Sequence, residues 1–200
     1  MTKPKGRPRQ FDELKVKQAI LQTFWEKGFA ATSLDDLSKA TDLVRPSLYG
    51  AFGSKTDMYV MALDTFLEKL TDIRMSLGKT ETHQEALEVF LLGMTDVYYD
   101  QTSQKQLGCF LVGTALTEAP NNPIIREALA QRMAKFEQML EMTLKAKSPS
   151  ASSTNIKLAV EQATAVMHSL AVRARTGEPQ QNLSTFARTS SKIIASLLKD

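Results

Sequence analysis

The sequence has little that could brace a fold covalently or carry the chain across a membrane. One of its 200 residues, Cys109, is a cysteine, which excludes a disulfide framework within the chain and fits a reducing compartment. No apolar run reaches the roughly 18–20 residues that a membrane-spanning helix needs. The first residues also lack the apolar stretch of a secretion signal. We therefore expect a cytoplasmic protein.

Groups that usually mark a metal site or an enzyme are also scarce. The two histidines, His83 and His168, stand 85 residues apart, and no cluster of His, Cys, Asp and Glu has the spacing of metal ligands. A nucleophile elbow, a glycine-rich phosphate loop and an HExxH motif are all missing. The adjacent Asp35 and Asp36 suit the start of a helix, where the macrodipole favours carboxylates. We expect no enzyme activity, no cofactor and no metal.

The charge that is present is unevenly distributed. Residues 1–55 hold ten Lys and Arg against six Asp and Glu, whereas residues 56–200 hold fifteen against sixteen. The whole excess of positive charge thus lies in the first quarter of the chain, and part of it is concentrated in KPKGRPR at positions 3–9. A basic end on a neutral body is typical of nucleic-acid-binding proteins. A solvated disordered tail is the alternative for the first nine residues.

Helical periodicity extends along nearly the whole chain. Apolar residues recur at three- and four-residue intervals, and we find no convincing alternating strand and no internal repeat. The pattern predicts an all-α protein of about nine helices. They are expected at Phe11–Lys27, Ser33–Ala40, Pro46–Phe52, Ser54–Leu77, Gln84–Asp100, Cys109–Glu118, Pro123–Lys147, Thr154–Arg175 and Leu183–Lys199.

The second and third predicted helices are short and close together. Such a pair buries little surface, so it needs support from the first helix, as in a helix–turn–helix unit. In that unit the second short helix enters the major groove with its N-terminal residues towards the base edges. Here those residues are Arg45, Pro46 and Ser47. An arginine in this position can hold a guanine or a phosphate, and Tyr49 and Lys55 are placed to reach phosphates.

The segment TSLDDLSKATDLVRPSLYGAFGSKTDMY resembles the DNA-binding domain of the TetR family of bacterial repressors. The matching features are the TS opening of the second helix, the LY pair of the third, and F-x-S-K before the fourth. The leading GRPRQF and the later LGCFLVGTALTEAP resemble a branch of that family with a mid-chain Gly-Cys pair. Two positions depart from the family pattern. Asp42 replaces the usual glycine of the turn, and Val44 replaces a serine or threonine that would cap the third helix.

The resemblance implies two domains, a helix–turn–helix domain with a basic N-terminal arm over 1–55 and a helical effector-binding and dimerisation domain over 56–200. A basic arm of this kind favours the minor groove. The expected DNA-binding residues are Arg7, Arg9, Thr32, Ser33, Arg45, Pro46, Ser47, Tyr49 and Lys55.

The resemblance also places an effector pocket among the middle helices. The expected lining is Phe90, Met94, Tyr98, Cys109, Phe110, Thr114, Met133, Phe136, Met167 and His168. In some members of the branch the mid-chain cysteine senses electrophiles or oxidants. A lone cysteine in GCFLVG is otherwise a small buried hydrophobe, and His168 is either a satisfied interior histidine or a residue facing the cavity.

The last two helices are expected to pair with a second copy of the chain in a four-helix bundle. The residues expected for this bundle are Leu183, Phe186, Ile193, Ile194 and Leu197, some facing inward and some facing across the two-fold axis.

Together these patterns predict a homodimeric repressor on a palindromic operator, released by a small hydrophobic or electrophilic effector. Two alternatives remain at this point: an architectural DNA-binding protein without an effector, and a helical carrier or enzyme whose basic head is incidental.

Overall fold

The computed structural model describes residues 11–100 and 105–199. These residues form ten α-helices, a short 3-10 helix (η1) and a two-stranded hairpin. The elements are α1 (Glu13–Ala31), α2 (Leu34–Thr41), α3 (Arg45–Phe52), α4 (Lys55–Glu68), α5 (Thr71–Lys79), α6 (His83–Val97), β1 (Tyr99–Asp100), β2 (Lys105–Gln106), α7 (Phe110–Thr117), α8 (Pro123–Lys147), α9 (Ser153–Arg175), α10 (Gln180–Ala195) and η1 (Ser196–Leu198). The all-α prediction is confirmed. The hairpin, with Tyr99 opposite Gln106, was not predicted.

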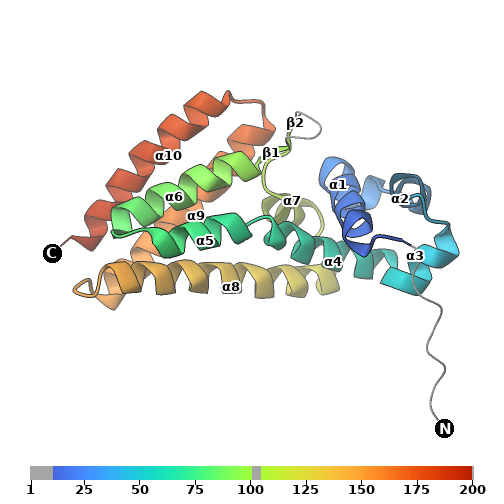
Figure 1. The fold of residues 1–200 in the computed structure, drawn as a ribbon, viewed down its shortest axis with the longest axis horizontal. Helices are drawn as coiled ribbons and strands as arrows, with labels where there is room; N and C mark the ends of the chain where they lie inside the picture. The colour runs from blue at the N-terminus through green and yellow to red at the C-terminus, as the bar shows by residue number, and fades with distance from the viewer. Residues whose placement is uncertain (1–10, 101–104, 200) are drawn as a thin grey trace, which may run out of the picture.

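The first three helices form a head at one end of an elongated molecule (Figure 1). Helix α4 leads from this head into the body, where α5, α6, α9 and α10 gather, and α8 runs beneath them along the body's length. One buried apolar cluster extends from α1 to α10. The expected boundary at residue 55 falls at the first residue of α4, and the core continues across it.

Helix α1 supports the head through its apolar stripe. Asp12 caps it by accepting the backbone N–H groups of Leu14 and Lys15. Its buried residues are Val16, Ile20, Leu21, Phe24 and Trp25. The helix kinks at Gly28, whose φ of 79° is favourable only for glycine, so the predicted end at this glycine is the kink itself.

The turn between α2 and α3 follows from its two unusual residues. Asp42 adopts the left-handed conformation at φ 55°, which aspartate tolerates better than most side chains. Val44 precedes α3 and supplies no side-chain cap, while Pro46 lies in the first turn, where the absence of an N–H costs nothing.

The predicted long helix over Ser54–Leu77 is wrong, because the chain breaks between Glu68 and Thr71 into α4 and α5. Neither proline nor glycine stands at the break. The two halves pack against different partners: α4 lies against α1 and α8, whereas α5 lies against α6. This tertiary packing overrides a local sequence that would continue as helix.

Candidate nucleic-acid interface and ligand cavity

One face of α3 is open to solvent. Arg45, Pro46 and Ser47 are exposed in its first turn, and Tyr49 is 47% exposed one residue after the buried Leu48. Leu48 fixes the helix to the core, so the side chains on either side of it point outward. The head therefore presents a short helix whose N-terminal residues are available to a partner.

The guanidinium of Arg45 is paired with a carboxylate of the preceding helix. Arg45 Nε donates to Asp35 Oδ1 at 3.0 Å, and Nη2 donates to Asp35 Oδ2 at 2.6 Å. The hydrogen bonds from the guanidinium to Asp35 raise the pKa of Arg45 above its usual value. Sequence reasoning gave Asp35 only a macrodipole role and missed this contact.

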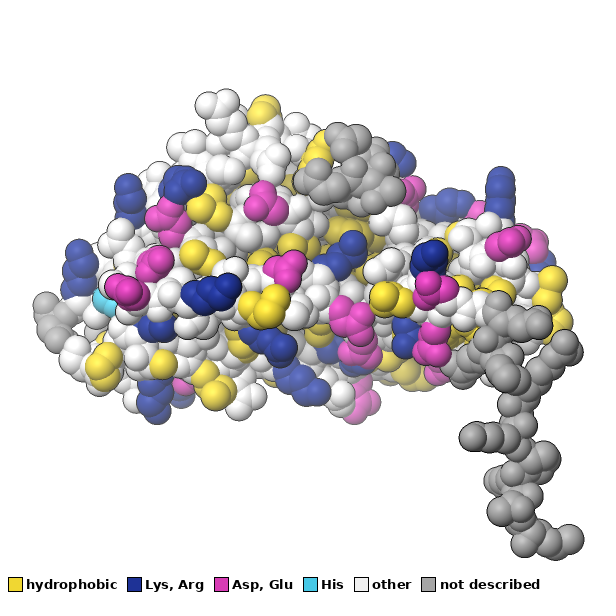
Figure 2. All heavy atoms as spheres, in the orientation of Figure 1, with side chains coloured by type: hydrophobic (Ala, Val, Ile, Leu, Met, Phe, Trp, Pro, Cys, Tyr) yellow, Lys and Arg dark blue, Asp and Glu magenta, His cyan; other side chains and the backbone are white. Residues whose placement is uncertain are grey.

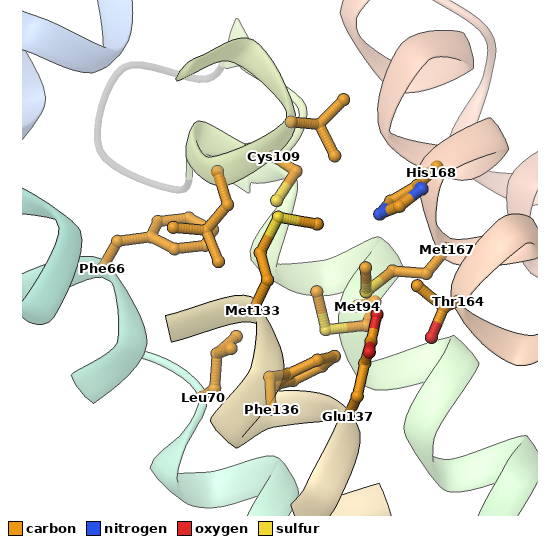
Figure 3. A pocket seen from close by; sticks show the side chains of 12 residues that line it. Phe66, Leu70, Met94, Cys109, Met133, Phe136, Glu137, Thr164, Met167 and His168 are labelled. Carbon is orange, nitrogen blue, oxygen red and sulfur yellow. The ribbon is translucent and has the colours of Figure 1, made fainter. Parts of the chain in front are cut away.

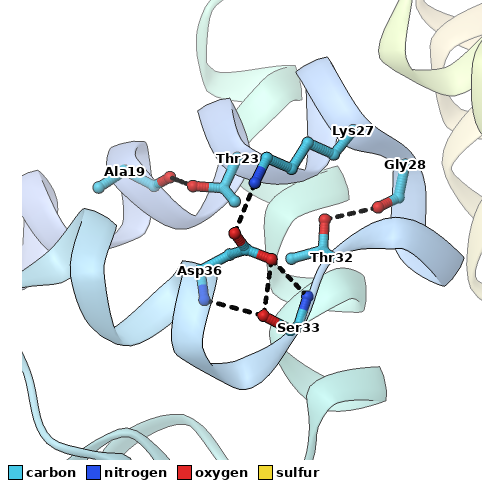
Figure 4. A network of polar contacts seen from close by, with 7 residues as sticks. All are labelled: Ala19, Thr23, Lys27, Gly28, Thr32, Ser33 and Asp36. Carbon is cyan, nitrogen blue, oxygen red and sulfur yellow. Dashed lines mark hydrogen bonds and ion pairs between the residues drawn. The ribbon is translucent and has the colours of Figure 1, made fainter.

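The expected DNA contact by Thr32 is wrong, since this residue is buried. It is 1% exposed, and its hydroxyl donates to the Gly28 carbonyl oxygen at 2.6 Å. Figure 4 shows it inside a polar network at the junction of α1 and α2. A residue held there is structural, because its hydroxyl ties the link between α1 and α2 to the end of α1.

Ser33 is exposed but its hydroxyl is already engaged in a capping box. Ser33 Oγ accepts the Asp36 N–H at 3.1 Å and donates to Asp36 Oδ2 at 2.7 Å (Figure 4). Lys27 Nζ of α1 binds the other carboxylate oxygen at 2.5 Å. The Lys27 and Ser33 hydrogen bonds hold the pKa of Asp36 well below its usual range. This arrangement fixes the start of α2 against α1.

Lys55 lies beside the head's aromatic cluster. Its ammonium is 4.4 Å from the centroid of the Phe29 ring, a cation–π contact. Partial burial lowers the pKa of Lys55. The other two basic residues of the expected DNA interface, Arg7 and Arg9, lie outside the described residues.

One face of the body carries mixed charge. On the face drawn in Figure 2, Lys and Arg side chains alternate with Asp and Glu over α5, α6 and α8. Interspersed charges do not build the single-sign field that attracts nucleic acid, so the exposed face of α3 is a better candidate for DNA binding than this face of the body.

An apolar cavity lies at the centre of the body, between α4, α6, α7, α8 and α9. Six of the ten expected lining residues surround it: Met94, Cys109, Met133, Phe136, Met167 and His168. Their side chains converge on one space in Figure 3. The cavity volume is about 10 Å³, room for about one water molecule.

Four residues expected in the lining do not contribute to this cavity. Phe90, Tyr98, Phe110 and Thr114 are all buried elsewhere in the core. The two polar ones are already hydrogen-bonded, with Tyr98 Oη donating to the Met167 carbonyl oxygen at 3.3 Å and Thr114 Oγ1 to that of Phe110 at 2.8 Å. Neither hydroxyl lines this cavity, although Phe110 and Thr114 line a second pocket between α1 and α7.

Sequence reasoning missed half of the lining. The residues it missed are Phe66, Leu70, Leu111, Val112, Glu137 and Thr164. Helical spacing could have found three of them, since Thr164 stands four residues before His168, Val112 three residues after Cys109, and Glu137 four residues after Met133. Leu70 could not be found this way because it lies at the unpredicted break between α4 and α5.

Two buried polar atoms of α9 are left without a partner among the described residues. They are Thr164 Oγ1 and His168 Nε2, and in Figure 3 the His168 ring points into the cavity. Burial lowers the pKa of His168, while Glu137 acts in the opposite direction. A neutral imidazole with an unmet hydrogen bond is a binding group that a ligand could satisfy.

Cys109 lines the cavity as a protonated thiol. It is 5% exposed, and burial raises its pKa to about 11, although the backbone N–H groups of Val112 and Leu111 lower it. Since the thiolate is the reactive form of cysteine, this environment does not activate the residue.

Helix α7 connects this cavity to the head. Cys109 lies at its N-terminus, and farther along Thr114 Oγ1 and Tyr59 Oη of α4 are 2.8 Å apart in a hydrogen bond. At its C-terminus the Glu118 carboxylate accepts the backbone N–H of Phe29 in α1 at 3.2 Å. A change in the cavity can therefore reach the helix that supports α2 and α3.

The residues expected at a dimer interface divide into two groups. Leu183 and Ile194 are buried within the protomer, at 1% and 3% exposure, so they are inward-facing members of the expected set. They lie on the side of α10 that packs against α6 and α9. Ile193 is 64% exposed, while Phe186 and Leu197 are half-buried, so these three remain available.

Residues 11–100 and 105–199 contain no group of three or more side chains that could hold a metal ion, and none of their helices is long and apolar enough to cross a membrane.

The chain is similar to bacterial transcriptional regulators. The model of bacterial regulatory proteins of the tetR family matches residues 18–61. The HTH-type transcriptional repressor ComR of Escherichia coli (strain K12) is 24% identical over 202 residues, 98% of this chain and 95% of ComR. The uncharacterized HTH-type transcriptional regulator YezE of Bacillus subtilis (strain 168) is 25% identical over 134 residues, 66% of this chain and 68% of YezE.

A solved structure resembles the whole chain. It is a cysteine mutant of the TetR-family transcriptional regulator CifR, complexed with 26-bp double-strand operator DNA. The two chains superimpose with a TM-score of 0.81 at 25% identity, covering 93% of this chain and 98% of the CifR chain. The similarity thus includes the head, the cavity region and the last two helices.

Proposed function

Because this chain is a member of the TetR family of bacterial regulatory proteins, we propose that it is a transcriptional repressor that binds operator DNA through α3. The observation that carries the proposal is the exposed first turn of α3, where Arg45, Ser47 and Tyr49 face solvent while Leu48 anchors the helix. ComR is named a repressor and CifR is solved on operator DNA, and both relatives match nearly the whole chain. This function requires no enzyme activity and is exercised where the chromosome is, in the cytoplasm.

The repressor acts as a homodimer. A palindromic operator offers the same half-site twice, so a two-fold pair of heads reads it with one surface. Ile193 on α10, with Phe186 and Leu197, supplies an apolar surface for the partner. In this arrangement the exposed residues of α10 face the second copy and the buried ones hold α10 to its own body.

The effector is a small, mainly apolar molecule with a hydrogen-bonding group. The lining is apolar apart from Thr164, His168 and Glu137, and the first two offer the unmet buried atoms. Since the cavity volume is only about 10 Å³, such a molecule must displace side chains. Three methionines, Met94, Met133 and Met167, are the residues that move most easily, because their unbranched chains adapt to new shapes.

Binding in the cavity releases DNA by shifting a conformational equilibrium. Expansion of the cavity displaces α7, and α7 carries that displacement to α4 through Thr114 and to α1 through Glu118. The α3 helices of the two copies then lose the spacing that matches successive major grooves. A coupling of about 1–3 kcal/mol lowers DNA affinity about 5–150-fold.

Two measurements on the full chain test this function. The first is retention on double-stranded DNA as a function of salt, where a repressor shows a steep loss of affinity with rising salt. The second is a thermal-shift screen of small molecules, followed by DNA release for each molecule that stabilises the protein. A carrier or enzyme with an incidental head gives stabilising ligands but no DNA retention, and an architectural protein gives DNA retention but no stabilising ligand. Either result contradicts the proposal.

A further inference from the structure

The Arg45–Asp35 pair joins the first turns of the two helices that form the candidate DNA-binding unit. Arg45 begins α3 and Asp35 is the second residue of α2. Both side chains face solvent, with exposed fractions of 55% and 73%. Their contact is nonetheless bidentate, which fixes the plane of the guanidinium as a single hydrogen bond does not.

Asp35 is not needed to begin its own helix. The capping box of α2 is formed by Ser33 and Asp36, and the second carboxylate oxygen of Asp36 binds Lys27. Asp35 precedes Asp36 by one residue and points to α3 instead. Its carboxylate is therefore free to serve Arg45.

The pair leaves one particular edge of the guanidinium unoccupied. Asp35 accepts from Nε and from Nη2, while an arginine carries five N–H donors. The donors that remain are the two N–H groups of Nη1 and the second N–H group of Nη2. One of each points away from the side chain at the outer end of the guanidinium. Two parallel donors at this end match the O6 and N7 acceptors that guanine presents in the major groove.

A fixed guanidinium distinguishes bases better than a mobile one. A free arginine on the first turn of α3 can turn to the nearest phosphate, a contact that carries no sequence information. An unpaired Asp35 in the same place would repel phosphates. The pairing of Asp35 with Arg45 removes this repulsion and keeps the guanidinium from rotating towards a phosphate. The arginine therefore meets the base edge already oriented.

We propose that Asp35 is a specificity-determining residue, which holds Arg45 so that the free end of its guanidinium reads one guanine in each operator half-site. This role rests on the proposed function, because it requires α3 to lie in the major groove. Asp35 is a positioning residue and acts on the DNA through Arg45.

The test is selection of bound sequences from a random pool of double-stranded DNA, made in parallel with the full-length protein and four variants. Asp35→Asn removes the charge and most of the bidentate contact, whereas Asp35→Glu keeps a carboxylate. Arg45→Ala identifies the position that the arginine reads. Asp42→Asn is the matched control, since it removes one exposed carboxylate from the turn between α2 and α3, a carboxylate that does not bind Arg45, and asparagine tolerates the left-handed conformation found there.

We expect the natural chain to enrich guanine at a position where Arg45→Ala enriches no base. At that position the preference of Asp35→Asn for guanine over other bases falls at least about fivefold, the smallest effect of a bidentate base contact. Asp35→Glu recovers part of the preference and Asp42→Asn keeps all of it. Affinity for unrelated DNA stays constant or rises in Asp35→Asn, because a negative charge has been removed.

Two results would overturn the inference and leave the proposed function intact: an unchanged base preference in Asp35→Asn, or the same loss in Asp42→Asn. The first result would mean that Asp35 only competes with DNA for Arg45 and does not orient it. The second would mean that the base preference depends on the net charge of the head and not on the Arg45–Asp35 contact. Failure of the natural chain to enrich any sequence contradicts the proposed function itself. Thermal unfolding of each variant verifies that all are folded.

Discussion

The carboxylate of Glu118 on α7 accepts a hydrogen bond from the backbone N–H of Phe29 on α1, across 89 positions of sequence. It is 8% exposed, and its Oε1 is the nearest neighbour that a Cβ on Gly28 would meet, at 3.6 Å. The contact thus joins the far end of the cavity helix to the kink of the helix that supports the head. It is a polar link between the cavity region and the head.

Replacing Glu118 by alanine should weaken the response to effector more than it weakens DNA binding. The change leaves the Phe29 N–H without its partner, which costs about 1–3 kcal/mol of unfolding free energy. Operator affinity and its reduction by a saturating effector are measured by fluorescence anisotropy. Glu118→Gln, which keeps an acceptor, is the control and should retain most of the response. An alanine variant that releases DNA as fully as the natural chain excludes this link as the route.

Gly108 should not tolerate a side chain. Its φ is +67°, and an added Cβ would lie 2.5 Å from the backbone oxygen of Ala171, a clash that α9 cannot relieve by a rotamer change. We expect Gly108→Ala to lower the unfolding free energy by more than about 1 kcal/mol. The matched control is Gly113→Ala in α7, where nothing lies within 4 Å of the new Cβ and helix propensity predicts a gain of up to about 1 kcal/mol. Denaturant unfolding measures both, and equal effects would refute the close approach.

Substitutions of Tyr49 and Thr32 should have opposite effects, one lowering operator affinity and the other lowering stability. Tyr49→Ala removes a half-exposed ring of α3, so it should lower operator affinity while unfolding free energy stays within about 0.5 kcal/mol. Thr32→Val removes a buried hydroxyl bonded to Gly28, so it should cost about 0.5–1.5 kcal/mol in stability and leave the operator affinity of the folded fraction unchanged. Thermal unfolding and anisotropy on the same samples check both. A Thr32→Val variant that keeps its stability but loses operator affinity would show that Thr32 does contact the DNA.

Cys109 should react slowly with alkylating agents at neutral pH. Burial raises its pKa to about 11, so the thiolate fraction is small near neutrality and grows as the pH approaches that value. Labelling by iodoacetamide, followed by mass spectrometry in the native and denatured protein, should show protection at neutral pH that is lost on unfolding. Fast labelling of the folded protein at pH about 7, close to that of a free thiol, contradicts a buried, protonated residue and supports a sensing role.

The exposed Ile193 should be required for dimerisation. A charge placed on this apolar surface of α10 would have to be buried against the partner, which is costly without a counter-charge. Ile193→Lys is therefore expected to sediment as a monomer and to lose operator affinity. Met142→Lys on α8 is the control, because Met142 is similarly exposed, at 67% against 64%, but lies outside the expected interface. An Ile193→Lys variant that remains a dimer shows that α10 does not form the contact.

The head was predictable because its signals are local. A capping box begins α2, a positive-φ Asp42 forms the turn and Pro46 lies in the first turn of α3, and each of these depends on residues close by in the sequence. The break after Glu68 has no local cause, since it arises from the different partners of α4 and α5.

The site residues show the same division. Exposure of Arg45 and Tyr49 follows from the apolar pattern of α3. The contact of Arg45 with Asp35 spans ten positions, and that of Glu118 with Phe29 spans 89, so both required the arrangement of whole helices. Tyr98 and Thr114 lie on the expected helices, but their hydroxyls are bonded within the core, a detail of side-chain packing that periodicity does not determine.

The spacing of the sequence elements in the selected DNA tests the central claim most directly. If two copies of the chain place α3 in successive major grooves, sequences enriched from a random pool must contain an inverted repeat with half-site centres about 10–10.5 bp apart, or a multiple of that distance. The bound complex must also contain an even number of chains per repeat. Enrichment of a single unrepeated element by one chain, or no enrichment at all, would contradict the account.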